Sequence, residues 1–466
     1  MKMITKRGIF LWILSALFIV GLVFLSYSLV TEGSTWVMKS YNRHVYSNGE
    51  LIAAGDITDR DGVVLATTED GERVYNDDET TRLATLHVVG DAKGYISTSV
   101  QANFESELVG YSLLTGIYNN VQNGKGNNIE LTIDAEINAV ALEALGNYKG
   151  TVAVVNYKTG DIVCMVSTPT YDVNDVPSDL DTSDEYEGVY LNRFLSGLYT
   201  PGSTFKLVTA ICALENYGDD ILDESWYCTK YLDVDGIEED EVVCNAYHGT
   251  TTFETALAKS CNYTFAEIAI ELGADKLIDT IETLGLENSV TVSDTITSSE
   301  SLFFLESDSA DATVGWTGIG QGDTLVTPAS MLRLMCAIAN EGSAVSFNLI
   351  NDFSNQAGQT LGITFSEDET QLMSTSTANT MKELMRNNVT SQYGDSNYSG
   401  LSLCAKSGTA QIDDVDEHNT AWFVGFMDDE DNPYAFVVVV EYGNSGSQTA
   451  GPIANKVLQA IVADDD

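Results

Sequence analysis

Ser203 and Lys206 are the first two residues whose types and spacing could carry out a reaction. They occur in the stretch YTPGSTFKLVTAICALENY, where Pro201 and Gly202 precede the serine and a helix is expected to run on from it. A lysine three residues after a serine lies on the same helix face, where its amine can take the hydroxyl proton and activate the serine as a nucleophile. The amine must be neutral to do so, and burial near other cations is the physical route to that state. Because most Ser-x-x-Lys matches are exposed helix positions, this pair needs support from elsewhere in the chain.

The second element is the stretch LAKSCNYTF, in which Ser260 and Asn262 could project toward the same cleft. Ser260 could relay a proton, and Asn262 could hold a substrate amide. The alternative interpretation is an ordinary helix start.

The third element is the run Lys406, Ser407, Gly408 and Thr409, on a predicted strand. The lysine can bind a substrate carboxylate, and the glycine lets an extended peptide approach the strand. The backbone N–H of Thr409 can join that of Ser203 in an oxyanion hole. We therefore expect all four residues of the run to bind the substrate.

The segments around these elements predict strands at both ends of a domain and helices between them. A helical apolar period over residues 133–148 precedes a β-hairpin over residues 150–167, whose turn is Lys158-Thr159-Gly160. Helical periods follow from near residue 203, over residues 253–272 and over residues 328–341, and strands occupy residues 401–411, 419–429 and 434–443 before a closing amphipathic helix. This order predicts an α+β domain in which helices cover an antiparallel sheet.

The N-terminal segment is a predicted membrane anchor. No charged residue occurs from Gly8 to Thr31, a run long enough to cross a hydrocarbon core of roughly 30 Å as a helix. A cleaved signal peptide is the alternative, but its apolar region spans only about 7–15 residues, and no clear small-x-small cleavage site follows this run. Lys2, Lys6 and Arg7 precede the span, so the positive-inside rule places the N-terminus in the cytoplasm and the rest of the chain outside.

The remainder divides at a polar linker, NNVQNGKGNN, at residues 119–128. Before it, the stretch GDITDRDGVVLATTEDGERVY reads as short strands broken by Asp-Gly turns. We expect residues 1–31 to form the tail and anchor, residues 32–128 a small N-terminal β-rich domain, and residues 129–466 the catalytic domain.

Charge and cysteine content restrict the possible partners. With 69 acidic and 22 basic side chains, the chain should repel nucleic acid. Its seven cysteines are too few for a disulfide scaffold and too scattered for a zinc site, so no metal and no cofactor are expected. Cys228 and Cys244 flank an acidic loop that would lie in an oxidising compartment, which favours one disulfide between them.

The order Ser-x-x-Lys, Ser-x-Asn, Lys-Ser-Gly is the motif set of penicillin-binding proteins and class A β-lactamases. With GDITDRDGVVLA, GDIVCMVSTPTYD, GIGQGDTLVTPASM and NTAWFVGF, the chain resembles class B penicillin-binding proteins, and most closely the penicillin-binding protein A branch. Two positions depart from the common β-lactamase pattern, Cys261 inside the second motif and Ser407 in place of a threonine; both variants look like class B enzymes.

The resemblance implies a penicilloyl-serine transferase fold, like that of β-lactamases, and a peptidoglycan D,D-transpeptidase. In such an enzyme Ser203 would attack the penultimate D-Ala of a stem peptide, and Lys206 and Ser260 would pass a proton to the leaving D-Ala. An amine of a neighbouring stem peptide would then take the acyl group, and β-lactams would acylate the same serine. Cell-wall synthesis proteins such as a glycosyltransferase are the implied partners at the bacterial cell membrane.

Two alternatives stay open. A β-lactamase needs a deacylation base, and no Glu-x-x-Leu-Asn segment follows Ser260. A non-catalytic β-lactam sensor or cell-wall scaffold could use the same fold, although only seven residues precede the apolar run to serve as cytoplasmic machinery. A serine–histidine hydrolase or zinc peptidase is not favoured, because none of the four histidines lies in a nucleophile-elbow or His-Glu-x-x-His context.

Overall fold

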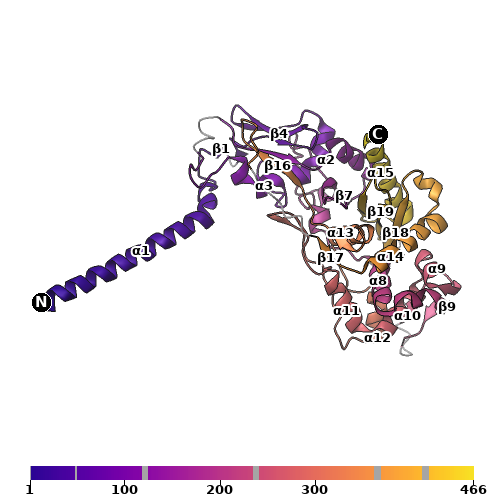
Figure 1. Ribbon diagram of the computed structural model, residues 1–466. Helices are drawn as coiled ribbons and strands as arrows, with labels where there is room; N and C mark the ends of the chain where they lie inside the picture. Colours follow the sequence, from indigo (N-terminus) through magenta and orange to yellow (C-terminus); the bar gives the residue numbers. More distant parts are fainter. Residues whose placement is uncertain are drawn as a thin grey trace.

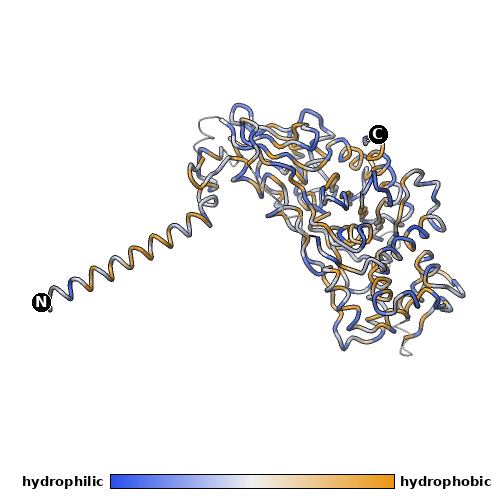
Figure 2. Tube along the Cα trace, viewed as in Figure 1, coloured by the Kyte–Doolittle hydropathy of each residue, from blue (hydrophilic) through white to orange (hydrophobic). Residues whose placement is uncertain are grey.

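The computed structural model describes residues 2–47, 50–117, 124–234, 241–361, 369–411 and 419–465. One long helix, α1 (Lys2–Val37), projects from a folded body that holds the other elements (Figure 1). Its segment Thr5–Val37 is long and apolar enough to cross a membrane, and none of its apolar window is buried against the protein. Figure 2 shows apolar residues along this helix, in agreement with the predicted anchor.

The centre of the body is a five-stranded antiparallel sheet with the strand order β18-β19-β20-β7-β8. Its strands are β7 (Gly150–Asn156), β8 (Ile162–Thr168), β18 (Leu403–Ala410), β19 (Thr420–Met427) and β20 (Tyr434–Val440). The first two form the predicted hairpin, with Lys158, Thr159 and Gly160 at its turn. Strands from the two ends of the domain meet at the β20–β7 pair, and β18 lies at the edge.

Helices cover both faces of this sheet. On one face, α13 (Pro328–Ala339) contacts β19 and β20. On the other, α6 (Ala135–Leu145) and α15 (Gly451–Asp465) contact each other and the sheet. Successive side chains of β20 enter different cores, with Val437 on the α13 side and Val438 on the α6 side, because strand side chains alternate between faces. The predicted α+β class is therefore confirmed.

A helical block lies beside the edge strand β18, at the end of the body away from α1 (Figure 1). It contains α8 (Lys206–Tyr217), α9 (Phe253–Ala258), α10 (Asn262–Leu272), α11 (Ala274–Thr283), α12 (Asp311–Gly318) and α14 (Thr375–Asn388). The prediction of one helical stretch over residues 253–272 was wrong. The helix breaks at Ser260, whose φ of 56° lies in the left-handed region, and a new helix begins at Asn262.

A second sheet lies between the central sheet and α1, with the strand order β16-β6-β3-β4-β5. Its strands are β3 (Ile57–Thr58), β4 (Val64–Glu69), β5 (Glu72–Tyr75), β6 (Asn128–Leu131) and β16 (Ile350–Ser354). The boundary expected after residue 128 thus falls within β6, and β16 joins from far along the chain. Beside this sheet, α2 (Glu79–Val89) packs on α6 and β8, and its Arg82 forms an ion pair of 2.6 Å with Asp172.

Further short helices and strands lie between these elements. The α-helices are α3 (Val100–Asn103), α4 (Glu105–Leu108) and α7 (Arg193–Ser196). Two-residue strands are β1 (Tyr46–Ser47), β2 (Glu50–Leu51), β10 (Tyr231–Leu232), β11 (Val242–Val243), β14 (Ile296–Thr297), β15 (Ser343–Ala344) and β17 (Thr370–Gln371). Longer ones are β9 (Ser225–Cys228), β12 (Gly249–Thr252) and β13 (Thr291–Ser293). β9 pairs with β12 and β10 with β11.

Candidate active site

Ser203 lies in a single 3-10 turn, η2 (Gly202–Thr204), directly before α8. Gly202 has a φ of 53°, and a Cβ atom there would lie 2.9 Å from the backbone oxygen of Thr409. Only glycine fits this combination of left-handed backbone and close approach. The turn is therefore pressed against β18, which brings the predicted nucleophile next to the predicted substrate-binding strand.

The Lys206 amine lies 2.9 Å from the Ser203 hydroxyl oxygen, as the predicted pairing requires. It also donates to the Ser260 backbone oxygen at 2.8 Å and to Oδ1 of Asn262 at 2.7 Å. Both of these atoms can only accept, and a neutral amine has two N–H groups for them and one lone pair left for a hydroxyl proton. When the Lys206 amine is neutral, it can therefore keep both of these bonds and still accept the Ser203 proton.

Burial explains how that neutral form is reached. The Lys206 side chain is completely buried, and this burial lowers its pKa from 10.5 to about 8, because an ammonium ion loses its hydration there. A lysine with such a pKa is a competent general base close to neutral pH.

Ser260 places its hydroxyl between two lysines. Its Oγ lies 3.2 Å from the amine of Lys206 and 3.1 Å from that of Lys406. Burial, and next the charge of Lys206, hold the pKa of Lys406 well below its usual value. Two buried amines around one hydroxyl do not both keep a positive charge without further cost, so the arrangement favours passage of a proton through Ser260.

Asn262 makes two hydrogen bonds within the protein. Its Oδ1 accepts from Lys206, and its Nδ2 donates to the backbone oxygen of Val243 at 2.9 Å. Both ends of the amide that was predicted to hold the substrate are therefore bonded within the protein. The amide oxygen contacts the lysine amine, and one amide hydrogen remains, so the contact of Asn262 with a substrate amide stays a prediction.

The substrate-binding run lies on the edge strand β18. Lys406 is fully buried and also donates to the backbone oxygen of Ser407 at 2.7 Å, whereas Thr409 is exposed. A Cβ atom on Gly408 would lie 2.9 Å from both the Pro201 backbone oxygen and Cγ2 of Thr204. The glycine is thus needed for contact with the nucleophile turn, and its part in the approach of a peptide stays a prediction.

Tyr393 is a neighbour of the site that the sequence did not reveal. Its hydroxyl accepts from the Ser407 backbone N–H at 2.9 Å and lies 3.0 Å from the Ser407 Oγ. The residue ends the π-helix η5 (Val389–Tyr393), and its ring packs edge-on to Phe423. No motif marks it, because the contact depends on where the turn after α14 meets β18.

The predicted disulfide between Cys228 and Cys244 is not formed in the structure, where both thiols are free. Instead, Cys228, Cys244, His248 and Cys261 converge, with their ligand atoms all within 4.8 Å of one another. The expectation that the cysteines are too scattered for a metal site was therefore wrong. His418, another histidine near a motif, lies outside the described residues.

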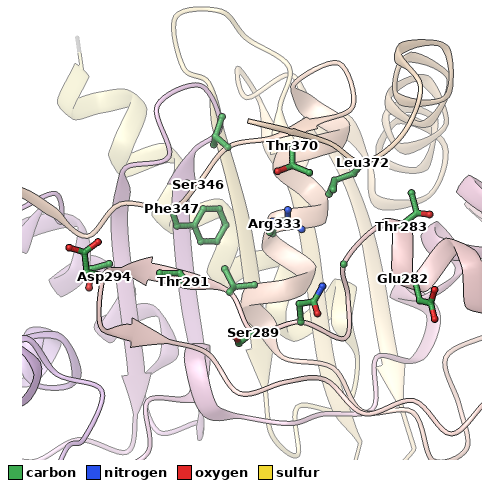
Figure 3. Close-up of a pocket in the computed structure, with 15 residues that line it drawn as sticks. Glu282, Thr283, Ser289, Thr291, Asp294, Arg333, Ser346, Phe347, Thr370 and Leu372 are labelled. Carbon is green, nitrogen blue, oxygen red and sulfur yellow. The ribbon is translucent and has the colours of Figure 1, made fainter. Parts of the chain in front are cut away.

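A separate cavity of about 530 Å³ lies beside α13, which contributes Arg333 to its lining (Figure 3). Arg333, Phe347, Asp294 and Glu282 are among its lining residues, and Arg333 donates to the backbone oxygen of Leu284 at 3.2 Å. None of the predicted catalytic residues lines it. The predicted catalytic residues lie instead in the serine–lysine cluster between α8, α10 and β18.

The chain is similar in sequence to a known protein family and to characterised relatives. The family model described as penicillin binding protein transpeptidase domain matches residues 150–459. The peptidoglycan D,D-transpeptidase PbpA of Mycolicibacterium smegmatis is 30% identical over 366 residues, which are 73% of this chain and 72% of that protein. The protein of the same name from Mycobacterium tuberculosis is 27% identical over 368 residues, 72% of this chain and 73% of that one.

The fold of the chain is also similar to that of solved structures. The penicillin G acyl-enzyme complex of penicillin-binding protein A from M. tuberculosis is 25% identical, with a TM-score of 0.77, over 88% of this chain and 99% of that chain. The D,D-transpeptidase domain of a peptidoglycan glycosyltransferase from Eggerthella lenta is 26% identical, with a TM-score of 0.74, over 90% and 99% of the two chains.

Proposed function

The chain belongs to the penicillin-binding protein transpeptidase family, and from that membership we propose that Ser203 is the nucleophile of its peptidoglycan D,D-transpeptidase activity. The chain is a class B enzyme of the penicillin-binding protein A branch. The observation that carries the residue assignment is the Lys206 amine, which is buried, has two obligate acceptors and lies 2.9 Å from the Ser203 hydroxyl.

In the acylation step, the Ser203 oxygen forms a bond to the carbonyl carbon of the penultimate D-Ala of a stem peptide. The hydroxyl proton moves to the neutral Lys206 amine. When the peptide C–N bond breaks, the leaving nitrogen of the terminal D-Ala takes a proton from Lys206 through the Ser260 hydroxyl. The step ends with an ester on Ser203, free D-Ala and Lys206 neutral again.

In the second step, an amine of a neighbouring stem peptide attacks the ester and gives up its proton by the reverse route. The backbone N–H groups of Ser203 and Thr409 stabilise the oxyanion in both steps. The donor peptide lies along the edge of β18, where Lys406 and Ser407 hold its carboxylate. β-Lactams react with Ser203 as mimics of this donor.

The direct test uses full-length protein in detergent, a pentapeptide donor ending in D-Ala-D-Ala and a D-amino acid acceptor. Mass spectrometry should detect both free D-Ala and the exchanged peptide, and neither with Ser203→Ala. Product formation by the Ser203→Ala variant would refute the nucleophile. Rapid catalytic hydrolysis of penicillin without any exchanged peptide would make the chain a β-lactamase instead.

The helix α1 makes the chain a single-pass membrane protein. We infer that its N-terminus is cytoplasmic and that its body lies outside, because Lys2, Lys6 and Arg7 precede the apolar run. Residues 32–128, whose strands share a sheet with β6 and β16, then lie nearest the membrane, and a glycosyltransferase that supplies glycan strands is the expected partner. Protease treatment of intact spheroplasts should digest the body; its full protection would reverse the orientation.

A further inference from the structure

We propose that Cys228, Cys244, His248 and Cys261 bind one Zn²⁺ ion, and that this ion fixes the position of the Ser260–Asn262 motif. The proposal goes beyond transpeptidation, because it assigns a structural metal site to residues that take no part in the acyl transfer. Three of the ligands are thiols that are completely or almost completely buried, and the fourth is the Nδ1 atom of a half-buried imidazole.

The distances fit a tetrahedral ion. With a Zn–S bond of about 2.3 Å and a Zn–N bond of about 2.0–2.1 Å, two sulfurs of a tetrahedral site lie about 3.8 Å apart, and a sulfur and a nitrogen about 3.6 Å apart. The Sγ atoms of Cys244 and Cys261 are 3.7 Å apart. The His248 Nδ1 lies 3.5 Å from the Cys244 Sγ and 3.8 Å from the Cys228 Sγ. These three distances match the edges of such a site, and all four ligand atoms lie within 4.8 Å of one another.

The ligands come from four separate places in the local fold. Cys228 ends β9, Cys244 follows β11, His248 precedes β12, and Cys261 precedes the first residue of α10. The strands involved form two sheets of only two strands each, which are marginally stable without a further link. A bound zinc ion contributes folding free energy in such a setting, because it ties together segments that share little core.

One of the three sulfurs has a hydroxyl donor beside it, as a metal-bound thiolate would. The Thr264 hydroxyl donates to the Cys261 Sγ at 3.3 Å and is paired with the Thr251 hydroxyl at 3.0 Å. Donors of this kind orient and stabilise metal-bound thiolates.

The donor set selects the metal. Three soft thiolates and one imidazole in tetrahedral array form a closed Cys₃His site, the kind that holds structural zinc. A disulfide between Cys244 and Cys261 is the competing outcome in an oxidising compartment, but it would leave the convergence of Cys228 and His248 unexplained.

The site lies directly beside the catalytic cluster. Cys261 stands between Ser260, which bridges the two lysines, and Asn262, which orients Lys206. Asn262 also bonds the backbone oxygen of Val243, the residue before Cys244. Loss of the ion should therefore disturb the acceptor that keeps Lys206 aligned, even though the metal touches no reacting atom.

The test measures metal content in full-length protein purified in detergent with a thiol reductant and without metal-affinity resin. Inductively coupled plasma mass spectrometry should find one zinc per chain in the wild type and in Ser203→Ala, so the result does not depend on the proposed nucleophile. Cys228→Ser and His248→Ala should lose most of the zinc. Cys336→Ala, a buried cysteine of α13 outside the cluster, is the matched control and should retain it.

Cobalt reconstitution gives a second readout on the unaltered chain. Removal of zinc by a chelator should lower the penicillin acylation rate at least tenfold, and Zn²⁺ should restore it; Co²⁺ should give the visible absorption bands of a tetrahedral thiolate site. Wild type that holds less than a tenth of a zinc per chain and gives no cobalt bands would overturn the proposal. So would a Cys244–Cys261 disulfide in peptide maps of protein isolated from the cell surface.

Discussion

The amine nitrogen of Lys206 lies 2.9 Å from the hydroxyl oxygen of Ser203, and its two other short contacts are to carbonyl oxygens. Those two acceptors use both N–H groups of a neutral amine, so the lone pair is left for the serine proton. In the neutral fraction of the amine, the positions of its neighbours therefore leave the lone pair free for the serine proton before any substrate binds.

Acylation should depend on pH through Lys206. Because the base acts in its neutral form, the acylation rate should rise with pH, be half-maximal near pH 8 and fall tenfold per unit below that value. At pH 7, a pKa of about 8 leaves about 9% of the amine neutral, whereas the ordinary lysine pKa of 10.5 would leave about 0.03% neutral. Stopped-flow measurement with a fluorescent penicillin tests this. Lys206→Arg stays charged, so its acylation rate should fall roughly 10²–10⁴-fold. A wild-type acylation rate that does not change from pH 6 to 9 would refute Lys206 as the base.

Replacement of Ser260 separates its hydroxyl from its backbone. Ser260→Gly and Ser260→Ala both remove the hydroxyl between the two lysines, so both should lower the acylation rate by about 10²-fold. Alanine is strained at a φ of 56° and glycine is not, so the alanine variant should be less stable by about 1 kcal/mol. Thermal unfolding and acylation kinetics give the two readouts. A wild-type rate in Ser260→Gly would contradict the proton relay.

A methyl group on Gly408 should impair acylation without altering any reacting group. In Gly408→Ala the new Cβ would meet the Pro201 backbone oxygen at 2.9 Å, so the nucleophile turn must move away from β18. We expect at least a tenfold loss of acylation rate. In the control Gly315→Ala, the new atom meets only the tip of Ile270 at 3.2 Å, and the rate should stay unchanged. Equal rates for both variants would count against the contact.

The ion pair between Arg82 and Asp172 should couple the N-terminal region to the catalytic domain. The Arg82 Nε lies 2.7 Å from the Asp172 Oδ1, and the Arg82 Nη2 lies 2.6 Å from the Asp172 Oδ2. The Arg82 side chain is 9% exposed and that of Asp172 is 14% exposed. Asp172→Ala leaves the Arg82 charge largely buried, which should cost about 3 kcal/mol of unfolding free energy. The exposed pair of Lys456 with Glu143 is the control, and Lys456→Ala should cost less than about 0.5 kcal/mol. Chemical denaturation of the full chain compares them; similar midpoints would mean that the two regions are not coupled here.

The sequence predicted the strand on which Lys406 lies, the hairpin turn at Lys158 and the pairing of Ser203 with Lys206, because these depend on local period and spacing. It could not predict the break at Ser260, since the helical apolar period continues across residues 253–272 while the backbone changes direction to reach the lysines. Contacts between distant segments were also missed. Tyr393 meets Ser407 only once η5 packs beside β18, and β16 joins β6 across more than two hundred residues.

The convergence of the cysteines could not be predicted from the sequence either, because it also depends on contacts between distant segments. Cys228 and Cys244 were predicted to pair because they flank one loop, but the second motif brings Cys261 to the same point through the start of α10. Separation along the chain made the cluster look scattered, and only the fold of β9 to β12 brings its members together.

The assignment of Ser203 as the nucleophile is tested most directly by measuring the site and the lifetime of the penicilloyl adduct. Full-length protein treated with penicillin G should gain the mass of one penicilloyl group, and peptide mapping should place it on Ser203. The ester should persist for many minutes, because no Glu-x-x-Leu-Asn segment, which would supply a deacylation base, follows Ser260. Ser203→Ala should gain no mass. An adduct on another residue, or an unchanged gain of mass in Ser203→Ala, would contradict the central claim.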